Sequence, residues 1–173
     1  MSGAVDPRSM EVVLGGTFDP VHDGHRALFS RAFGLGNVTV GLTSDGLANQ
    51  SRYRDRYVRP FEERRRDLRS ELEGFAERHE RTYEIRTLTE PTGIAVEPPF
   101  QVLVVSPETR EGGEKINDIR EERGLEPLRI EVVPHERAED GGIISSTRIT
   151  RGEIDEHGNL TPDAEPRRPR ASE

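Results

Sequence analysis

Two histidines three positions apart, His22 and His25, lie between an apolar run and a helical pattern. Gly15 and Gly16 precede them and let the backbone turn sharply and approach a ligand closely. Gly24 falls at the expected helix start, where unpaired N–H groups and the helix dipole attract an anion. Each imidazole can donate a hydrogen bond to a phosphate oxygen. The stretch GGTFDPVHDGH therefore predicts an anion site.

A second polar segment, GIISSTRI, lies near the other end of the chain. Ser145, Ser146 and Thr147 crowd an expected helix start and are followed by Arg148. An ordinary helix cap is the alternative, but a cap needs only one hydroxyl. Three hydroxyls, helix amides and a guanidinium suit a bound polyphosphate.

A third segment, SPET, follows the apolar run QVLVV and carries Ser106, Glu108 and Thr109. Taken alone it indicates a simple turn. The other three histidines stand singly, and we interpret each as an ordinary surface or core side chain. They are His79, His135 and His157.

Alternating strands and helices must position these segments. Periodicity predicts strands at 11–14, 38–42, 83–88, 101–105 and 128–133, helices at 25–33, 60–79 and 114–123, and a short helix from 145. We expect residues 44–58 to form a polar, arginine-rich connection. This order predicts an α/β fold with a doubly wound, five-stranded parallel sheet. Ligands bind such sheets outside the carboxyl ends of the strands.

The length of 173 residues suits one domain, which we expect to span residues 10–160. The polar lead at 1–9 and the proline-rich tail at 161–173 contain too few apolar residues to pack, so we expect both to be disordered. No apolar run reaches membrane-spanning length, and the N-terminus lacks the layout of a signal peptide. The chain has no cysteine. These features predict a cytoplasmic protein with no membrane partner.

The chain is acidic, with a net charge of −8 and Lys115 as its only lysine. An acidic surface suits a salt-rich cytoplasm, because screening weakens repulsion between carboxylates. A GC-rich genome that replaces lysine codons with arginine codons is the alternative. The acidic balance argues against nucleic-acid binding. The sequence is compatible with a monomer and does not determine the oligomeric state.

GTFDPVHDGH and ISSTRI together resemble the two motifs of the HxGH nucleotidyltransferase superfamily. Residues 22–25 match the HxGH signature, whereas residues 149–151, Ile-Thr-Arg, depart slightly from the usual Ile-Arg ending. The blocks GLTSDGLA, RPFEERRRDL, VVSPET, KINDIREERGLEPL and SSTRITRGEIDEHG most resemble the archaeal type of phosphopantetheine adenylyltransferase. The resemblance covers residues 10–158.

This resemblance implies a Rossmann-like fold and adenylyl transfer from ATP to 4′-phosphopantetheine with Mg²⁺. The acceptor phosphate attacks the α-phosphorus in line, so catalysis depends on positioning and on charge stabilisation rather than on a protein nucleophile. It also implies that His22 and His25 are catalytic. The implied ATP-binding residues are Gly16, Thr17, Phe18, His22, Gly24, His25, Ser106, Glu108, Thr109, Ser145, Ser146, Thr147 and Arg148.

The superfamily commonly carries a lysine after the second strand to bind the acceptor phosphate, and this chain has LANQSRYRDRYVRPF there. Thr17, with Arg52 and Arg54, forms the predicted acceptor site. Arg56 and Arg59 could also supply the cation, and a solvated loop is the alternative for each arginine.

Other acceptors define the alternatives. Nicotinamide-mononucleotide adenylyltransferases more usually have Arg-x-x-Gln-Pro before HxGH, and this chain has Thr-Phe-Asp-Pro. Cytidylyltransferases and FAD synthases usually carry Arg-Thr-x-x-x-Ser-Thr, and this chain has Ile-Ser-Ser-Thr. A non-catalytic nucleotide-binding module on the same fold is a further alternative. The intact histidines and the SSTR run favour an enzyme.

Overall fold

The computed structural model describes residues 10–50 and 58–161. The predicted lead, all of the predicted tail except Thr161, and three of the four candidate acceptor arginines lie outside these residues. Those arginines are Arg52, Arg54 and Arg56.

Five parallel strands form one sheet in the order β3-β2-β1-β4-β5, which confirms the predicted fold class. The chain builds one half of the sheet outward from β1 and then returns to β4 on the other side. A crevice therefore opens at the carboxyl ends of β1 and β4, where the strand order reverses. The strands are β1 (Met10–Gly16), β2 (Gly36–Thr43), β3 (Tyr83–Leu88), β4 (Val102–Val105) and β5 (Arg129–Val132).

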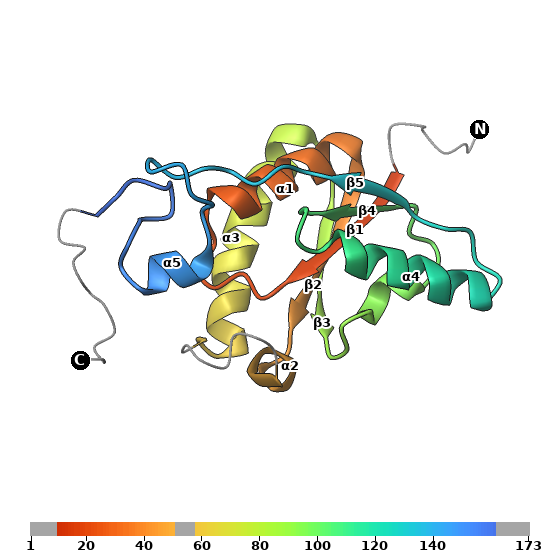
Figure 1. Cartoon of the computed structure of the whole chain (residues 1–173). Helices are drawn as coiled ribbons and strands as arrows, with labels where there is room; N and C mark the ends of the chain where they lie inside the picture. Colours follow the sequence, from red (N-terminus) through yellow and green to blue (C-terminus); the bar gives the residue numbers. More distant parts are fainter. Residues whose placement is uncertain (1–9, 51–57, 162–173) are drawn as a thin grey trace.

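Helices cover both faces of the sheet (Figure 1). The helices are α1 (Asp23–Leu35), α2 (Asp45–Gln50), α3 (Phe61–His79), the 3-10 helix η2 (Gly93–Val96), α4 (Arg110–Glu122) and α5 (Ser146–Thr150). Side chains alternate between the faces along β1: Val12 and Leu14 pack with α1 and α3, whereas Val13 packs with η2 and α4. Within the described residues, no helix is long and apolar enough to cross a membrane.

Several element boundaries differ from the prediction. Helix α1 begins two residues earlier, because the His22 side chain caps it. It ends at Leu35 with Gly36 as its cap, and Gly36 is one of the two glycines, with Gly34, that we expected to end it. Helix α4 begins at Arg110 rather than 114. Its Gly113 lies against the sheet, where an added Cβ would be 3.1 Å from Leu103. Helix α2 lies in the predicted connection, and Ser44 supports its start by accepting from Leu47 N–H at 3.1 Å.

The segment from Arg137 to Thr161, here called the C-terminal arm, folds around α5. Its own small apolar cluster contains Ala138, Ile144 and Ile154, with Ile149 packed against it. Short antiparallel bridges pair Arg137 with Ile143 and Ile154 with Leu160. The arm thereby holds α5 beside the start of α1 (Figure 1).

Candidate active site

A cavity of about 320 Å³ lies at the carboxyl ends of β1 and β4, between α1 and α5. It brings together twelve of the thirteen residues in the predicted ATP set. They are Gly16, Thr17, Phe18, His22, Gly24, His25, Ser106, Glu108, Thr109, Ser145, Ser146 and Thr147. His135, which we interpreted as an ordinary surface or core side chain, also lines the cavity. The parallel topology explains the convergence, because all these segments follow strands that end at one edge.

The two histidines of the HxGH signature cap α1 reciprocally. Gly24 N–H donates to His22 Nδ1 at 3.0 Å, and His22 N–H donates to His25 Nδ1 at 3.3 Å. In a neutral imidazole whose Nδ1 accepts, the proton is on Nε2. The rings stack with centroids 3.8 Å apart. The capping box therefore makes Nε2–H a donor on both histidines, side by side in the cavity wall.

Glycine is required at two positions because an aromatic ring lies directly over each. A Cβ on Gly24 would lie 2.9 Å from His22 Cε1, and a Cβ on Gly16 would lie 3.0 Å from the Phe18 ring. Phe18 is 2% exposed, and its ring meets the His25 ring edge-on with centroids 4.7 Å apart. It therefore supports the His25 imidazole from behind.

The three hydroxyls at the start of α5 have different surroundings. Ser145 Oγ accepts from Arg148 N–H at 3.2 Å, so Ser145 is the helix cap that we considered as the ordinary alternative. Ser146 Oγ donates to the carbonyl of Pro20 at 3.0 Å and thus joins the two motifs. Thr147 lines the cavity, and its hydroxyl makes no hydrogen bond within the described residues.

Arg148 does not line the cavity, contrary to its place in the predicted ATP set. Its guanidinium donates to Asp140, to Glu153 Oε1 at 2.8 Å and to the carbonyl of Ile143 at 3.4 Å. Hydrogen bonds to Asp140 and Glu153 raise the pKa of Arg148. The two carboxylates belong to the C-terminal arm, so the guanidinium stabilises the arm.

The SPET segment forms the turn that we considered and also lines the cavity. Ser106 N–H donates to Thr109 Oγ1 at 3.1 Å, which closes the turn after β4. Both side chains, with Glu108 between them, reach the cavity wall. The turn and the predicted site are thus the same structure.

A second cavity of about 500 Å³ adjoins the first and shares Gly16, Thr17 and Glu108 with it. Its remaining lining is largely apolar and comes from all the strands except β5, together with α2, η2, α4 and the loop after β3. These apolar residues include Gly41, Leu47, Ala48, Leu88, Ile94, Ala95 and Ile116. Sequence reasoning missed this cavity, because its apolar residues look like ordinary core residues.

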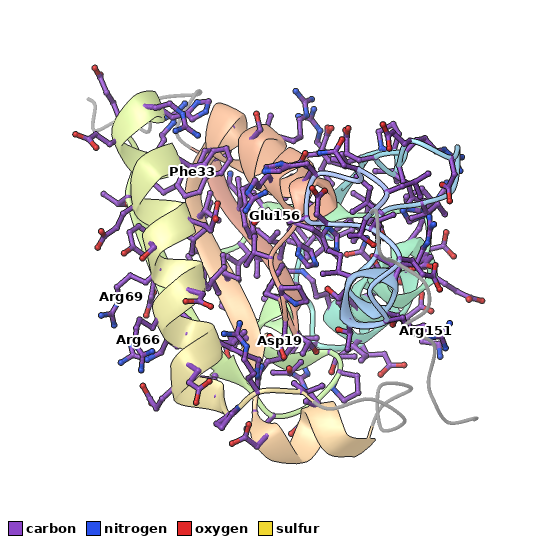
Figure 2. The ribbon with its side chains drawn as sticks, turned by 90° about the vertical axis from the view of Figure 1, so that its left-hand side faces the viewer. Asp19, Phe33, Arg66, Arg69, Arg151 and Glu156 are labelled. Carbon is purple, nitrogen blue, oxygen red and sulfur yellow. The ribbon has the colours of Figure 1, made fainter. Side chains whose placement is uncertain are left out.

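Arg59 is the one candidate acceptor arginine among the described residues, and it does not line either cavity. Its backbone N–H and Nε donate to Asp19 at 2.7 Å and 2.6 Å, and its guanidinium pairs with Asp67 at 2.9 Å. Asp19 thus lies beside the start of α3 (Figure 2). Arg59 anchors the Thr-Phe-Asp-Pro turn instead of reaching an acceptor.

An ion network joins the C-terminal arm to the first turn of α1. Arg26 pairs with Asp23 and Glu71, each at 2.9 Å, and with Glu156 (Figure 2). His157, which is an exposed side chain as predicted, contacts Asp23 at 3.1 Å. The hydrogen bond with Asp23 raises the pKa of His157. Burial alone would raise the pKa of Asp23, but bonds from Arg26 and His157 lower it. The sequence carries no periodic signal for this network.

Comparisons with known proteins agree with this architecture. A family model described as cytidylyltransferase-like matches residues 13–152. The phosphopantetheine adenylyltransferase of Methanosarcina acetivorans is 44% identical over 158 residues, which cover 90% of this chain and 98% of that protein. The phosphopantetheine adenylyltransferase of Archaeoglobus fulgidus is 44% identical over 153 residues, which cover 87% and 99%.

Among solved structures, a protein of unknown function from Archaeoglobus fulgidus is similar. It is 41% identical with a TM-score of 0.61, and the match covers 72% of this chain and 89% of that chain.

Proposed function

The chain belongs to the cytidylyltransferase-like family and, within it, to the archaeal phosphopantetheine adenylyltransferases, and on this premise we propose that it transfers the adenylyl group of ATP to 4′-phosphopantetheine. The products are dephospho-coenzyme A and pyrophosphate. The observation that carries the proposal is the meeting of two unlike cavities at Gly16 and Thr17. The cavity rich in hydroxyls and imidazoles suits ATP, and the largely apolar cavity suits the pantetheine arm.

In the proposed reaction, a phosphate oxygen of the acceptor attacks the α-phosphorus of ATP. The new P–O bond forms as the bond to the leaving pyrophosphate breaks in line. The Nε2–H groups of His22 and His25 would stabilise negative charge at the transferred phosphorus and on the leaving group. Thr147 and the amides at the start of α5 would hold the terminal phosphates. The stacked, capped imidazoles are already oriented, so little reorganisation accompanies the reaction.

Mg²⁺ is part of the proposal, as a partner of the nucleotide. Among the described residues, no three histidine, aspartate or glutamate side chains cluster so that they could hold a metal ion. The donors that line the first cavity are mainly hydroxyls, amides and imidazoles, which suit phosphate. The ATP phosphates would hold Mg²⁺, which would supply positive charge beside them, and Glu108 and Glu136 are the carboxylates in the lining of this cavity.

Pyrophosphate release tests the acceptor. The purified chain is incubated with Mg²⁺-ATP and phosphopantetheine, or with nicotinamide mononucleotide, FMN or glycerol 3-phosphate. We expect pyrophosphate release with phosphopantetheine and none with the other three acceptors. Release with another acceptor and none with phosphopantetheine would refute the assignment, and no release with any acceptor would favour a non-catalytic module.

Parallel assays at low and high KCl test the proposed adaptation to salt, for which we expect higher activity in high KCl.

His25→Ala tests the role of the imidazole. We expect the fold to persist and turnover to fall at least about a hundredfold, because a preorganised charge-stabilising donor is lost. Circular dichroism and urea unfolding check the fold, and pyrophosphate release measures turnover. Near-normal turnover in a folded variant would remove His25 from the mechanism.

A further inference from the structure

Arg64 is fully buried at the start of α3, whereas its neighbour Arg66 is exposed on the outer face of that helix (Figure 2). Among the described residues its one carboxylate partner is Asp45, at 3.0 Å, and that side chain is 58% exposed. A buried guanidinium is costly unless its donors are satisfied. The other acceptors of Arg64 therefore show what it holds in place.

These acceptors lie at the junction of the two cavities. Nη1 of Arg64 donates to the carbonyl of Thr17 and to Oγ1 of Thr43, each at 3.3 Å. Nε donates to the carbonyl of Arg59 at 2.7 Å. One side chain thus ties the ends of β1 and β2 to the start of α3.

A chain of hydroxyls continues from Arg64 to the site. Oγ1 of Thr43 lies 3.0 Å from Oγ1 of Thr17, and both residues are buried. A hydroxyl has one hydrogen to donate, and bonds that point in one direction strengthen one another. Thr43 accepts from Arg64, so its own hydrogen is available for donation to Thr17. With the bonds in that direction, the hydrogen of the Thr17 hydroxyl is available to a ligand in the cavities.

Thr17 lines both cavities, and Thr43 lines only the second. We propose that Arg64 and Thr43 are positioning residues, which orient the Thr17 hydroxyl as a donor to the acceptor phosphate. The inference rests on the proposed function, because it assigns the acceptor to the second cavity. In this arrangement the buried Arg64 supplies a positive charge near the acceptor. It acts through the two hydroxyls and not by direct contact.

Thr43→Val tests the relay with an isosteric side chain that cannot accept from Arg64 or donate to Thr17. Thr43→Ser keeps the hydroxyl and serves as the rescue. Thr39→Val is the matched control, because Thr39 is a buried threonine of the same strand that lines neither cavity. Arg64→Lys keeps the charge but loses the fork of donors. Urea unfolding is measured for every variant, with KM for ATP and for phosphopantetheine and the turnover number.

For Thr43→Val we expect KM for phosphopantetheine to rise about tenfold and KM for ATP to change less than about twofold, because one hydrogen bond to a charged group is lost. Thr43→Ser should restore the wild-type value, and Thr39→Val should not alter it. A folded Arg64→Lys variant should show the same selective rise in KM for phosphopantetheine. If that variant does not fold, the Thr43 variants alone test the proposal.

Two results overturn the proposal. An unchanged KM for phosphopantetheine in Thr43→Val would show that the relay does not serve the acceptor. An equal rise in both KM values would indicate a general structural role. A wild-type chain that releases no pyrophosphate with phosphopantetheine would instead refute the proposed function, and with it the acceptor named here. Wild-type activity thus distinguishes the two failures.

Discussion

We predict that Gly24→Ala lowers turnover strongly while the protein stays folded. The added Cβ would lie 2.9 Å from Cε1 and 3.0 Å from Nδ1 of His22, and real Cβ atoms do not approach other atoms that closely. The His22 ring is 6% exposed and stacks on His25. It therefore has to turn away from Gly24, which breaks the hydrogen bond between Gly24 N–H and His22 Nδ1.

The magnitudes follow from these contacts. Loss of a helix cap costs about 0.5–2 kcal/mol, and exchange of glycine for alanine in a helix gains up to about 1 kcal/mol. The two effects nearly cancel, so we expect the free energy of unfolding to change by less than about 1 kcal/mol. Turnover depends on the ring position instead, and a displacement of about 1 Å can lower a rate about a hundredfold.

Urea unfolding and pyrophosphate release measure the two quantities in the same preparation. Gly34→Ala is the control, because Gly34 lies in the same helix and an added Cβ there meets nothing within 4 Å. We expect this control to gain up to about 1 kcal/mol of stability with unchanged turnover. Wild-type turnover in Gly24→Ala would refute the argument that the ring position of His22 requires glycine.

Three further predictions concern the C-terminal arm. Ile154→Ala removes most of a side chain that is 1% exposed, so we expect the free energy of unfolding to fall by about 2–5 kcal/mol. We also expect weaker ATP binding, measured by calorimetry. An unchanged ATP affinity would show that the packing of the arm does not affect the candidate site. The pKa of His157 is raised by Asp23, so the pair stabilises the fold fully below the ordinary value of 6.5, and this contribution is lost as the pH rises through the raised pKa. His157→Gln should remove that part of the pH dependence of the urea midpoint above about pH 6.5, and an unaltered profile would contradict the assignment. Arg148→Gln and Asp140→Asn should each lower stability, and the double variant should lose less than their sum, whereas additive losses would mean that the pair is not coupled.

Most of the fold and of the candidate site was predicted from local features of the sequence. The spacing of glycines and histidines indicated an anion site at a helix start, and the HxGH residues do cap α1. The SPET turn and the cap at Ser145 are likewise interactions between near neighbours. The alternation of strand and helix patterns predicted the parallel sheet. Because ligands bind such sheets outside the carboxyl ends of the strands, it also predicted which loops would meet.

Tertiary contacts decided the rest. The role of Arg148 depends on Asp140 and Glu153, and the burial of Arg64 depends on how α3 packs against β1 and β2. An arginine run in a sequence does not say which side chain turns inward. The second cavity is likewise formed by apolar residues of several helices and strands, and its shape exists only after they pack.

The fold class and the location of the two motifs that line the first cavity could be predicted from the sequence alone, because these depend on residue type and short-range spacing. Which charged groups face a cavity and which face one another became known only from the folded structure. The physical reason is that a guanidinium or a carboxylate pairs with the nearest opposite charge in space, and that neighbour lies far away along the chain. Arg26 is one example: besides the nearby Asp23, it pairs with Glu71 and Glu156, which lie 45 and 130 positions away along the chain.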